Sequence, residues 1–132
     1  MIYRHLTQVR ISRYDTDGVV SIKIKMLKPA SEYNCPVEAT LDVIGGKWKV
    51  LILFWLQDQV WRFGELRRKI PHISERMLTQ QLRELEDNGV VHRKVYPVVP
   101  PRVEYSLTPY GRTLRPITDL MCEWGKKHLR RR

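Results

Sequence analysis

The strongest constraint on the fold is a stretch of the sequence that carries both helix-end signals and a single stripe of leucines. Ser74 is a preferred helix N-cap, and the Asn88-Gly89 pair suits a left-handed C-cap. The leucines between them are three and four residues apart, so they fall on one side of a helix. These leucines are Leu78, Leu82 and Leu85. The sequence therefore predicts a helix over 75–87 with one face against a core and the opposite face open.

Two segments of alternating polar and apolar residues follow this helix directly. They span residues 90–96 and 102–107, and a period of two predicts β-strands. The connection between them holds Pro97, Pro100 and Pro101, whose fixed backbone angles stiffen it. The two segments therefore predict a β-hairpin with a rigid tip.

Apolar periodicity predicts further helices on both sides of this unit. The upstream segments are helices over 36–44, 47–56 and 63–70, with a short extended piece at 61–63. The second of these is apolar all round, which is typical of a buried helix. Downstream, Thr108-Pro109 predicts the N-cap and first turn of a last helix, which Pro116 kinks or breaks. The expected fold class is mainly α with a small β-hairpin wing, in winged helix–turn–helix order.

Residues 1–34 differ from the rest, and we interpret them as an N-terminal extension and linker ahead of one domain over 35–132. Ile22, Ile24 and Met26 alternate with polar residues, which predicts one edge strand with no evident partner nearby. A second hypothesis is that Met26 is the native start and that residues 1–25 derive from an upstream start or an added segment.

The charge of the chain favours a polyanionic partner. Its 132 residues hold 24 Lys and Arg against 14 Asp and Glu, for a net charge of +10. Such a basic domain points most simply to nucleic acid. No phosphate-binding loop, nucleophile elbow, metal-ligand spacing or acidic pair in an apolar stretch is present in the sequence, so we expect no enzyme, no cofactor and no metal site. No apolar run reaches the roughly 20 residues that span a bilayer, so we expect no membrane partner.

The open face of the 75–87 helix carries residue types that read bases. Arg76, Thr79, Gln80 and Arg83 fall opposite the leucines. Arginine pairs with guanine edges, glutamine with adenine, and threonine with either. We therefore predict base reading by these four side chains. The alternative is that they form only the solvated face of an amphipathic helix.

Phosphate contacts are expected at the start of this helix and on the hairpin. Ser74 and the free N–H groups of the first turn suit a phosphate. The hairpin supplies Arg93 and Lys94 on one strand and Arg102 beside the tip, where we expect it at the minor groove or a flanking phosphate. The alternative is that these basic residues only keep an exposed ribbon in solution.

Several longer motifs carry a family resemblance. They are Cys35-Pro36-Val37-Glu38, Leu41 to Trp48, Phe63-Gly64-Glu65-Leu66, Ile73 to Leu85, Val95-Tyr96-Pro97 and Pro101 to Thr108. In this order they resemble the HxlR-type bacterial transcriptional regulators, relatives of the MarR group, over about residues 35–128. The resemblance implies a homodimeric winged helix that binds operator DNA, usually as a cytoplasmic repressor or activator. Residues 1–25 have no counterpart in that pattern, which favours Met26 as the start.

An apolar stripe on the last helix predicts a dimer. A domain of this size leaves too little of its own chain to cover the stripe, so we assign the stripe to a second copy. The predicted interface residues are Tyr110, Leu114, Ile117, Met121 and Trp124, together with Val37 and Leu41. A two-fold dimer predicts an operator that is an inverted repeat. The alternative is that the stripe folds back on its own domain.

Cys35 is a candidate redox sensor. It precedes a proline at a helix start, where the positive end of the helix dipole favours a thiolate. The resemblance adds that some regulators of this type sense oxidants or electrophiles through a cysteine at this position. The alternative is an inert thiol, which is our interpretation of Cys122. A small-molecule effector between Trp48, Trp55 and Trp124 is a further hypothesis, against their use in core packing.

Three classes of function remain after these observations. The first is a dimeric transcription factor of the HxlR type. The second is a winged-helix protein-interaction module that does not read DNA. The third is a ligand-binding or redox-active protein whose own chemistry is its function.

Overall fold

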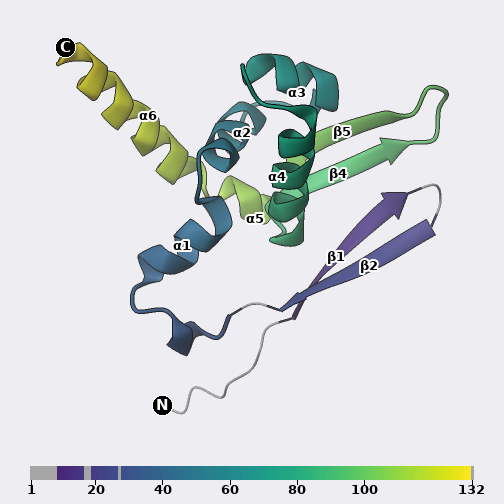
Figure 1. Cartoon of the computed structure of the whole chain (residues 1–132), viewed down its shortest axis with the longest axis horizontal. Helices are drawn as coiled ribbons and strands as arrows, with labels where there is room; N and C mark the ends of the chain where they lie inside the picture. The colour runs from purple at the N-terminus through teal and green to yellow at the C-terminus, as the bar shows by residue number, and fades with distance from the viewer. Residues whose placement is uncertain (1–8, 17–18, 27, 132) are drawn as a thin grey trace.

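The computed structural model describes residues 9–16, 19–26 and 28–131 of the chain. Its elements, drawn in Figure 1, are β1 (Val9–Thr16), β2 (Val19–Met26), the 3₁₀ turn η1 (Ala30–Glu32), α1 (Pro36–Ile44), α2 (Trp48–Leu56), β3 (Trp61–Arg62), α3 (Phe63–Lys69), α4 (Glu75–Asp87), β4 (Val91–Tyr96), β5 (Arg102–Leu107), α5 (Pro109–Arg112) and α6 (Arg115–Arg130). From α1 to α6 this is the winged helix–turn–helix order, so the predicted fold class is confirmed.

The core lies between helices α2, α3 and α4 and the sheet. As far as the structure describes side chains, the buried apolar ones run from Ile44 in α1 to Leu107 in β5. Leu66 of α3 and Leu78 and Leu85 of α4 are fully enclosed, at 0% exposed. Each such side chain stabilises the fold by about 1.5–3 kcal/mol through leaving water. The predicted leucine stripe is therefore what holds α4 on the core.

Helix α4 begins and ends where its capping residues predict. The Ser74 hydroxyl oxygen accepts a hydrogen bond from the Met77 backbone N–H at 3.1 Å. At the other end, Gly89 adopts a φ of 72°, the left-handed conformation that glycine tolerates best. The Ser74 cap and the conformation of Gly89 thus set both ends of α4.

The hairpin predicted after α4 belongs to a three-stranded antiparallel sheet in the order β3-β5-β4. In its register, Val91 lies opposite Leu107 at the base and Tyr96 opposite Arg102 at the tip. The short extended piece predicted near residue 61 is the third strand, β3, which pairs with β5. Figure 1 shows the β4–β5 hairpin projecting away from the helical body.

The last helix is broken into two, as Pro116 predicts. Helix α5 ends at Arg112, and α6 begins at Arg115 with Pro116 in its first turn. Thr108 ties this region to the end of α4: its hydroxyl donates to the Gly89 carbonyl at 2.6 Å and accepts from the Gly111 N–H at 2.9 Å. A Cβ atom at Gly111 would collide with the Val90 carbonyl oxygen, so only glycine allows this close approach.

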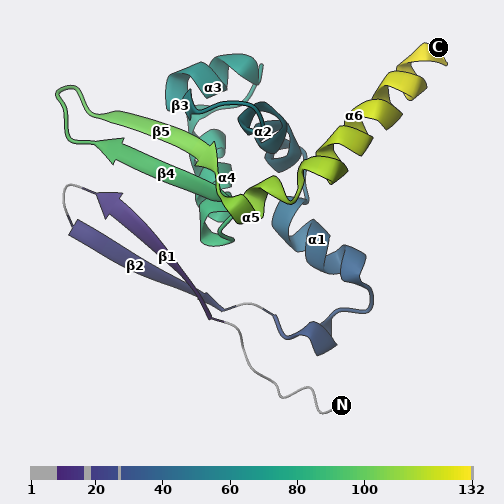
Figure 2. The ribbon, with the colours of Figure 1, turned by 180° about the vertical axis from the view of Figure 1, so that it is seen from behind.

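Segments 9–16 and 19–26 pair into a β-hairpin, which corrects the prediction of a single edge strand without a partner. β1 runs antiparallel to β2, with Arg10 opposite Lys25 and Ile11 opposite Ile24. This strand was missed because the apolar–polar alternation that begins with Val9 and Ile11 breaks at Arg13 and Asp15. β1 lies beside β4 and α4, as Figures 1 and 2 show.

Helix α2 differs from its prediction on one side. Ile52, Leu53 and Leu56 are buried against the core, as expected. Leu51 and Phe54, however, are 39% and 38% exposed, so the expectation that the whole helix is enclosed is wrong. The cause is geometric, because the described elements that contact α2 leave the side of Leu51 and Phe54 partly uncovered. No helix in the described ranges is long and apolar enough to cross a membrane.

Candidate nucleic-acid interface

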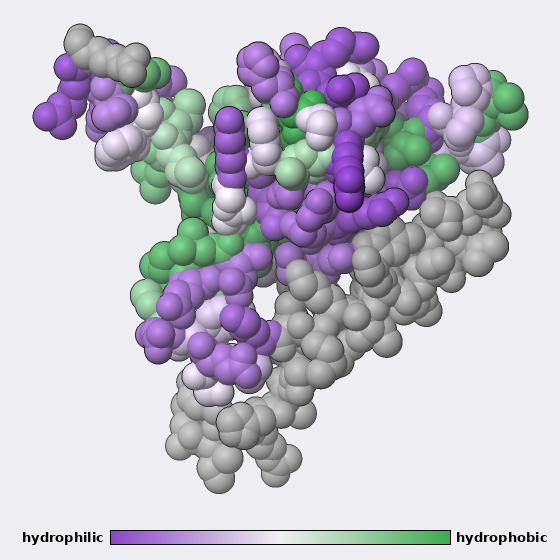
Figure 3. Space-filling model, in the orientation of Figure 1, coloured by the Kyte–Doolittle hydropathy of each residue, from purple (hydrophilic) through white to green (hydrophobic). Residues whose placement is uncertain are grey.

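The open face of α4 presents the residues predicted to read bases. Arg76, Gln80 and Arg83 are exposed, and Thr79 is half-buried beside them. Among the residues that the structure describes, none of the four makes a side-chain hydrogen bond or ion pair with the protein. Figure 3 shows hydrophilic residues over this part of the molecule. As far as the described side chains go, these donors and acceptors are therefore left to meet an outside partner while the leucines below hold the helix.

The start of α4 offers a phosphate-binding position. Ser74 is exposed, and its hydroxyl oxygen already accepts the Met77 N–H. The hydroxyl hydrogen is left to donate to a phosphate oxygen. The positive end of the helix dipole favours an anion at the same place.

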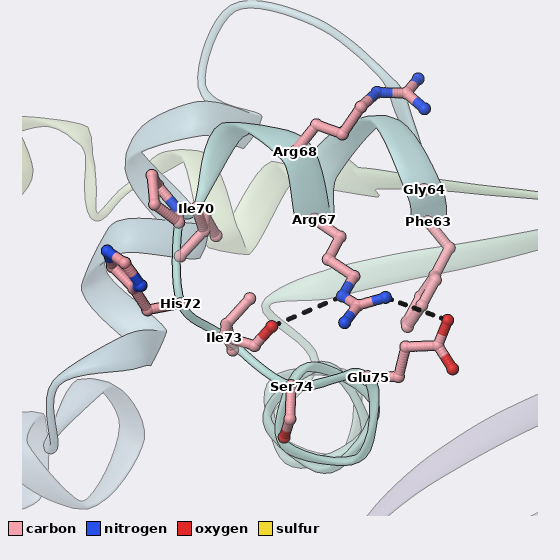
Figure 4. Close-up of a pocket in the computed structure, with 10 residues that line it drawn as sticks. Phe63, Gly64, Arg67, Arg68, Ile70, His72, Ile73, Ser74 and Glu75 are labelled. Atoms are coloured by element: carbon pink, nitrogen blue, oxygen red, sulfur yellow. Dashed lines mark hydrogen bonds and ion pairs between the residues drawn. The ribbon is translucent and has the colours of Figure 1, made fainter.

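The turn between α3 and α4 is braced by Arg67. An open hollow of about 670 Å³ lies between α3 and the start of α4. Arg67 crosses this hollow: its Nε donates to the Ile73 carbonyl at 3.4 Å, and its Nη1 lies 3.1 Å from Glu75 Oε1 (Figure 4). Arg68 points away from the pair (Figure 4). Arg67 and Glu75 are eight residues apart across a turn, and no local sequence pattern indicates such a pair.

Lys49 is likewise engaged within the protein. Its Nζ lies 2.6 Å from Glu84 Oε2, and its side chain is largely covered. This pair joins α2 to the rear of α4. Lys49 is therefore structural, in contrast to the exposed Lys47, whose Nζ lies 4.5 Å from the centre of the Trp48 ring.

The basic residues predicted on the wing lie on opposite faces of the hairpin. The register and the alternation of the strands place Arg93 on the same face as Tyr105, its cross-strand neighbour. Lys94 falls on the other face together with Tyr96 and Arg102. Neighbouring residues of a strand point to opposite faces, so the sequence alternation already separates Arg93 from Lys94. The prediction nevertheless treated the two as one group.

Arg93 lies against the buried edge of the sheet. Its side chain is half-buried and hydrogen-bonds Tyr105, which packs near Phe63 with ring centroids 6.4 Å apart. Burial raises the pKa of Tyr105, and the bond to Arg93 opposes that rise. Because Arg93 is engaged in this way, the exposed Lys94 is the better candidate for a phosphate contact on the wing.

A cluster at the outer end of the wing holds Arg102 in one orientation. The Arg102 guanidinium lies 4.2 Å from the centre of the Tyr96 ring, and Lys94 Nζ lies 4.8 Å from the same centre. Glu104 accepts a hydrogen bond from the Tyr96 hydroxyl at 3.1 Å, and its Oε1 lies 3.5 Å from Arg102 Nε. That Nε is buried and makes no hydrogen bond with the described residues, so the contact with Glu104 is an ion pair alone. Sequence reasoning did not select Tyr96 or Glu104.

The predicted dimer residues leave an apolar surface uncovered in the single chain. On α6, Ile117, Met121 and Trp124 are 37%, 49% and 67% exposed, and Trp124 stacks on His128 with ring centres 5.0 Å apart. Tyr110, Val37 and Leu41 are also exposed. Figure 3 shows hydrophobic residues over α1 and along α6. Leu114 differs, because it is half-buried and packs against the core of its own chain.

A small hollow beside these helices is a candidate effector site. It measures about 170 Å³ between α1 and α5 and is lined by Ala39, Thr40, Val43, Tyr110, Thr113 and Leu114. The three tryptophans proposed for an effector pocket do not gather there. Trp48 and Trp55 pack against the core, whereas Trp124 is on the exposed face of α6.

Cys35 is exposed at the N-cap of α1, and Cys122 is half-buried on α6. The segment before α1 is held by two hydrogen bonds, from the Tyr33 hydroxyl to Asp42 at 2.7 Å and from the Asn34 N–H to Glu38 at 2.8 Å. The bond to Asp42 raises the pKa of Tyr33. The structure therefore presents the Cys35 thiol on an ordered turn.

Comparison with known proteins agrees with this architecture. Residues 43–132 match the family described as HxlR-like helix-turn-helix. The chain is 59% identical over 95 residues to the HTH-type transcriptional regulator YdeP of Bacillus subtilis, covering 72% of this chain and 74% of that protein. It is 58% identical over 104 residues to YybR, named as a regulator of the same type from the same organism, covering 79% and 82% respectively.

Solved structures give the same result. The redox regulator HypR in its oxidised form is 61% identical and superimposes with a TM-score of 0.68, over 70% of this chain and 96% of that one. The diamide-treated regulator YodB of B. subtilis is 38% identical, with a TM-score of 0.59, over 70% of this chain and 93% of that one. By the matched residues and these identities, the chain belongs to the HxlR-like helix-turn-helix family.

Proposed function

We propose that this protein is a transcriptional regulator that binds duplex DNA in a sequence-specific manner and has no catalytic role. The observation that carries the proposal is the state of α4, whose leucines are enclosed while Arg76, Gln80 and Arg83 stay exposed and unpaired with described residues. The names of YdeP and YybR as HTH-type transcriptional regulators support it. A regulator of bacterial genes meets its DNA in the cytoplasm.

In this proposal α4 enters the major groove with its N-terminal half toward the bases. Arg76, Thr79, Gln80 and Arg83 read base edges, since their donors and acceptors match the patterns displayed there. Ser74 and the first-turn N–H groups bind a phosphate, which fixes the register of the helix on the duplex. The net charge of +10 adds attraction for the backbone at any sequence.

A second copy of the chain completes the binding unit. The exposed stripe of α6, with Val37 and Leu41 of α1, is the surface that it covers. A two-fold dimer places two α4 helices about 34–36 Å apart, one helical turn of DNA. The operator is therefore an inverted repeat.

The test is selection of bound sequences from random duplex, followed by variants of the reading face. Arg76→Ala or Gln80→Ala should weaken binding to the selected site by about 1–3 kcal/mol and relax the base preference at one position, with little change on unrelated duplex. Arg112→Ala and Gln59→Ala remove exposed side chains of the same types elsewhere and should leave the preference unchanged.

Two results would contradict the proposal. If both α4 variants weaken every duplex equally, these residues contact the backbone rather than bases. If the unaltered protein selects no inverted repeat and its weak binding has little salt dependence, it is a protein-interaction module instead.

Control by oxidants through Cys35 is the regulatory part of the proposal. It is supported by the exposure of the thiol at the start of α1 and by the name of HypR as a redox regulator. Selection repeated with reduced and oxidised protein should show different affinities. Cys35→Ser should remove the difference and Cys122→Ser should preserve it. Equal affinities in both states would leave effector control to a small molecule, for which the hollow between α1 and α5 is the first candidate.

A further inference from the structure

The tip of the β4–β5 hairpin is an exposed apolar segment with no role so far. Its residues, Pro97, Val98, Val99, Pro100 and Pro101, are defined here as the wing tip and include no charged or hydrogen-bonding side chain. Val99 is 100% exposed, the highest value among the large apolar side chains that the structure describes. Figure 3 shows the hydrophobic spot at the far end of the hairpin. A single exposed valine is ordinary, but a wholly apolar tip on a projecting hairpin is not explained by the fold.

The wing tip is held in a defined shape before any partner arrives. Three of its five residues are prolines, whose backbone angles are restricted. The Val98 N–H donates to the Tyr96 carbonyl at 2.9 Å, and Tyr96 is in turn paired across the hairpin with Arg102. Docking this tip therefore costs less conformational entropy than docking a flexible loop.

The charges around the wing tip indicate what it enters. Lys94 and Arg102 lie at its base on one face of the hairpin, both close to the Tyr96 ring. Glu104 on the same face pairs with Arg102, so the exposed Lys94 supplies the excess positive charge. An apolar tip with an excess of positive charge at its base suits the minor groove of DNA. Phosphates line both edges of this groove, and its base steps can admit an apolar side chain. The same hairpin follows α4 directly, so the tip continues the interface already proposed.

We propose, resting on the DNA-binding function above, that Val99 enters the minor groove beside each half-site and partly separates one base step. Apolar wedges of this kind kink the duplex and lower the cost of contact elsewhere. Steps that unstack easily, pyrimidine followed by purine, are favoured at that position. The wing tip thereby adds a preference in the operator flank that no hydrogen bond specifies.

The test compares two duplexes that share the selected inverted repeat, one with a TA step in each flank and one with a stiff A-tract there. Val99→Ser should lower affinity for the TA duplex roughly fivefold to tenfold and leave the A-tract duplex almost unchanged. A 2-aminopurine base placed at the step should brighten when the unaltered protein binds and stay quenched with the variant. Val60→Ser, an exposed valine between α2 and β3, is the matched control and should behave as the unaltered protein does.

The outcomes separate this inference from the proposed function. One outcome is that the unaltered protein selects an operator while the Val99→Ser variant binds both duplexes with the same affinities as the unaltered protein. In that case the insertion of Val99 is wrong and the proposed function stands. An equal loss on both duplexes, or a change in self-association without a change in DNA binding, also overturns the wedge. If the unaltered protein selects no duplex, the proposed function itself has failed.

Discussion

Helices α4 and α6 have the same kind of sequence pattern but differ in the burial of their apolar faces. Both carry an apolar stripe at spacings of three and four residues. The stripe of α4 is enclosed by its own chain, whereas Ile117, Met121 and Trp124 of α6 remain open. Periodicity therefore predicts that a face will be covered, but the covering element depends on how much chain lies nearby. α4 is surrounded by α2, β4 and the turn from α3, and α6 extends away from the body (Figure 1).

The sharpest way to break this comparison is to remove one leucine of α4. Leu82→Ala should lower the free energy of unfolding by about 2–5 kcal/mol, because it loses buried apolar surface and leaves a cavity in a packed core. Urea denaturation followed by circular dichroism measures the change. Val60→Ala, at an exposed site, should change it by less than about 0.5 kcal/mol. A small effect of Leu82→Ala would mean that α4 is not held by its stripe.

The matching substitution on α6 should act on assembly instead. Trp124→Ala should weaken the dimer by about 2–4 kcal/mol, since a large aromatic side chain at the centre of an interface often dominates its energy. Sedimentation across a concentration series measures the dissociation constant. Its exposed neighbour Glu123 forms an ion pair with Lys126 at 3.4 Å on the same helix, so Glu123→Ala is the control. An unchanged dimer in Trp124→Ala would show that the exposed stripe of α6 is not the dimer interface.

The helix starts differ as well. α4 begins at a serine whose hydroxyl accepts the Met77 N–H, whereas Leu114 before α6 offers no side-chain cap. Ser74→Ala should therefore cost about 1 kcal/mol of stability. Ser74→Asp keeps a capping oxygen but repels phosphate, so it should keep the stability and weaken DNA binding. If the Ser74→Asp variant binds DNA as tightly as the unaltered protein does, no phosphate binds at the start of α4.

The parts of the fold that the sequence predicts are those set by neighbouring residues. The bounds of α4, the β4–β5 hairpin and the break at Pro116 follow from caps, alternation and proline geometry, and they are confirmed. The pairing of β1 with β2 and the exposed side of α2 depend on distant segments, so periodicity could not supply them. Leu114 shows the same limit, because its place in the stripe was predicted but its packing on the core was not.

The candidate site divides in the same way. The exposure of Arg76, Gln80 and Arg83 follows from the position of the leucines around one helix. The ion pair between Arg67 and Glu75 joins two helices across a turn, and the hydrogen bond from the Tyr96 hydroxyl to Glu104 joins β4 to β5. Such contacts require the three-dimensional arrangement, and they are the ones that orient the predicted residues.

Removal of residues 1–25, so that the chain starts at Met26, should have the smallest effect and tests how far the domain extends. As far as the structure describes side chains, every buried apolar residue lies between Ile44 and Leu107. HypR is matched over 96% of its length by 70% of this chain, so a close relative folds without a counterpart to the remaining part of this chain. The free energy of unfolding should therefore change by less than about 0.5 kcal/mol. A loss of several kcal/mol would instead show that β1, which lies beside α4 and β4, helps to hold α4 in place.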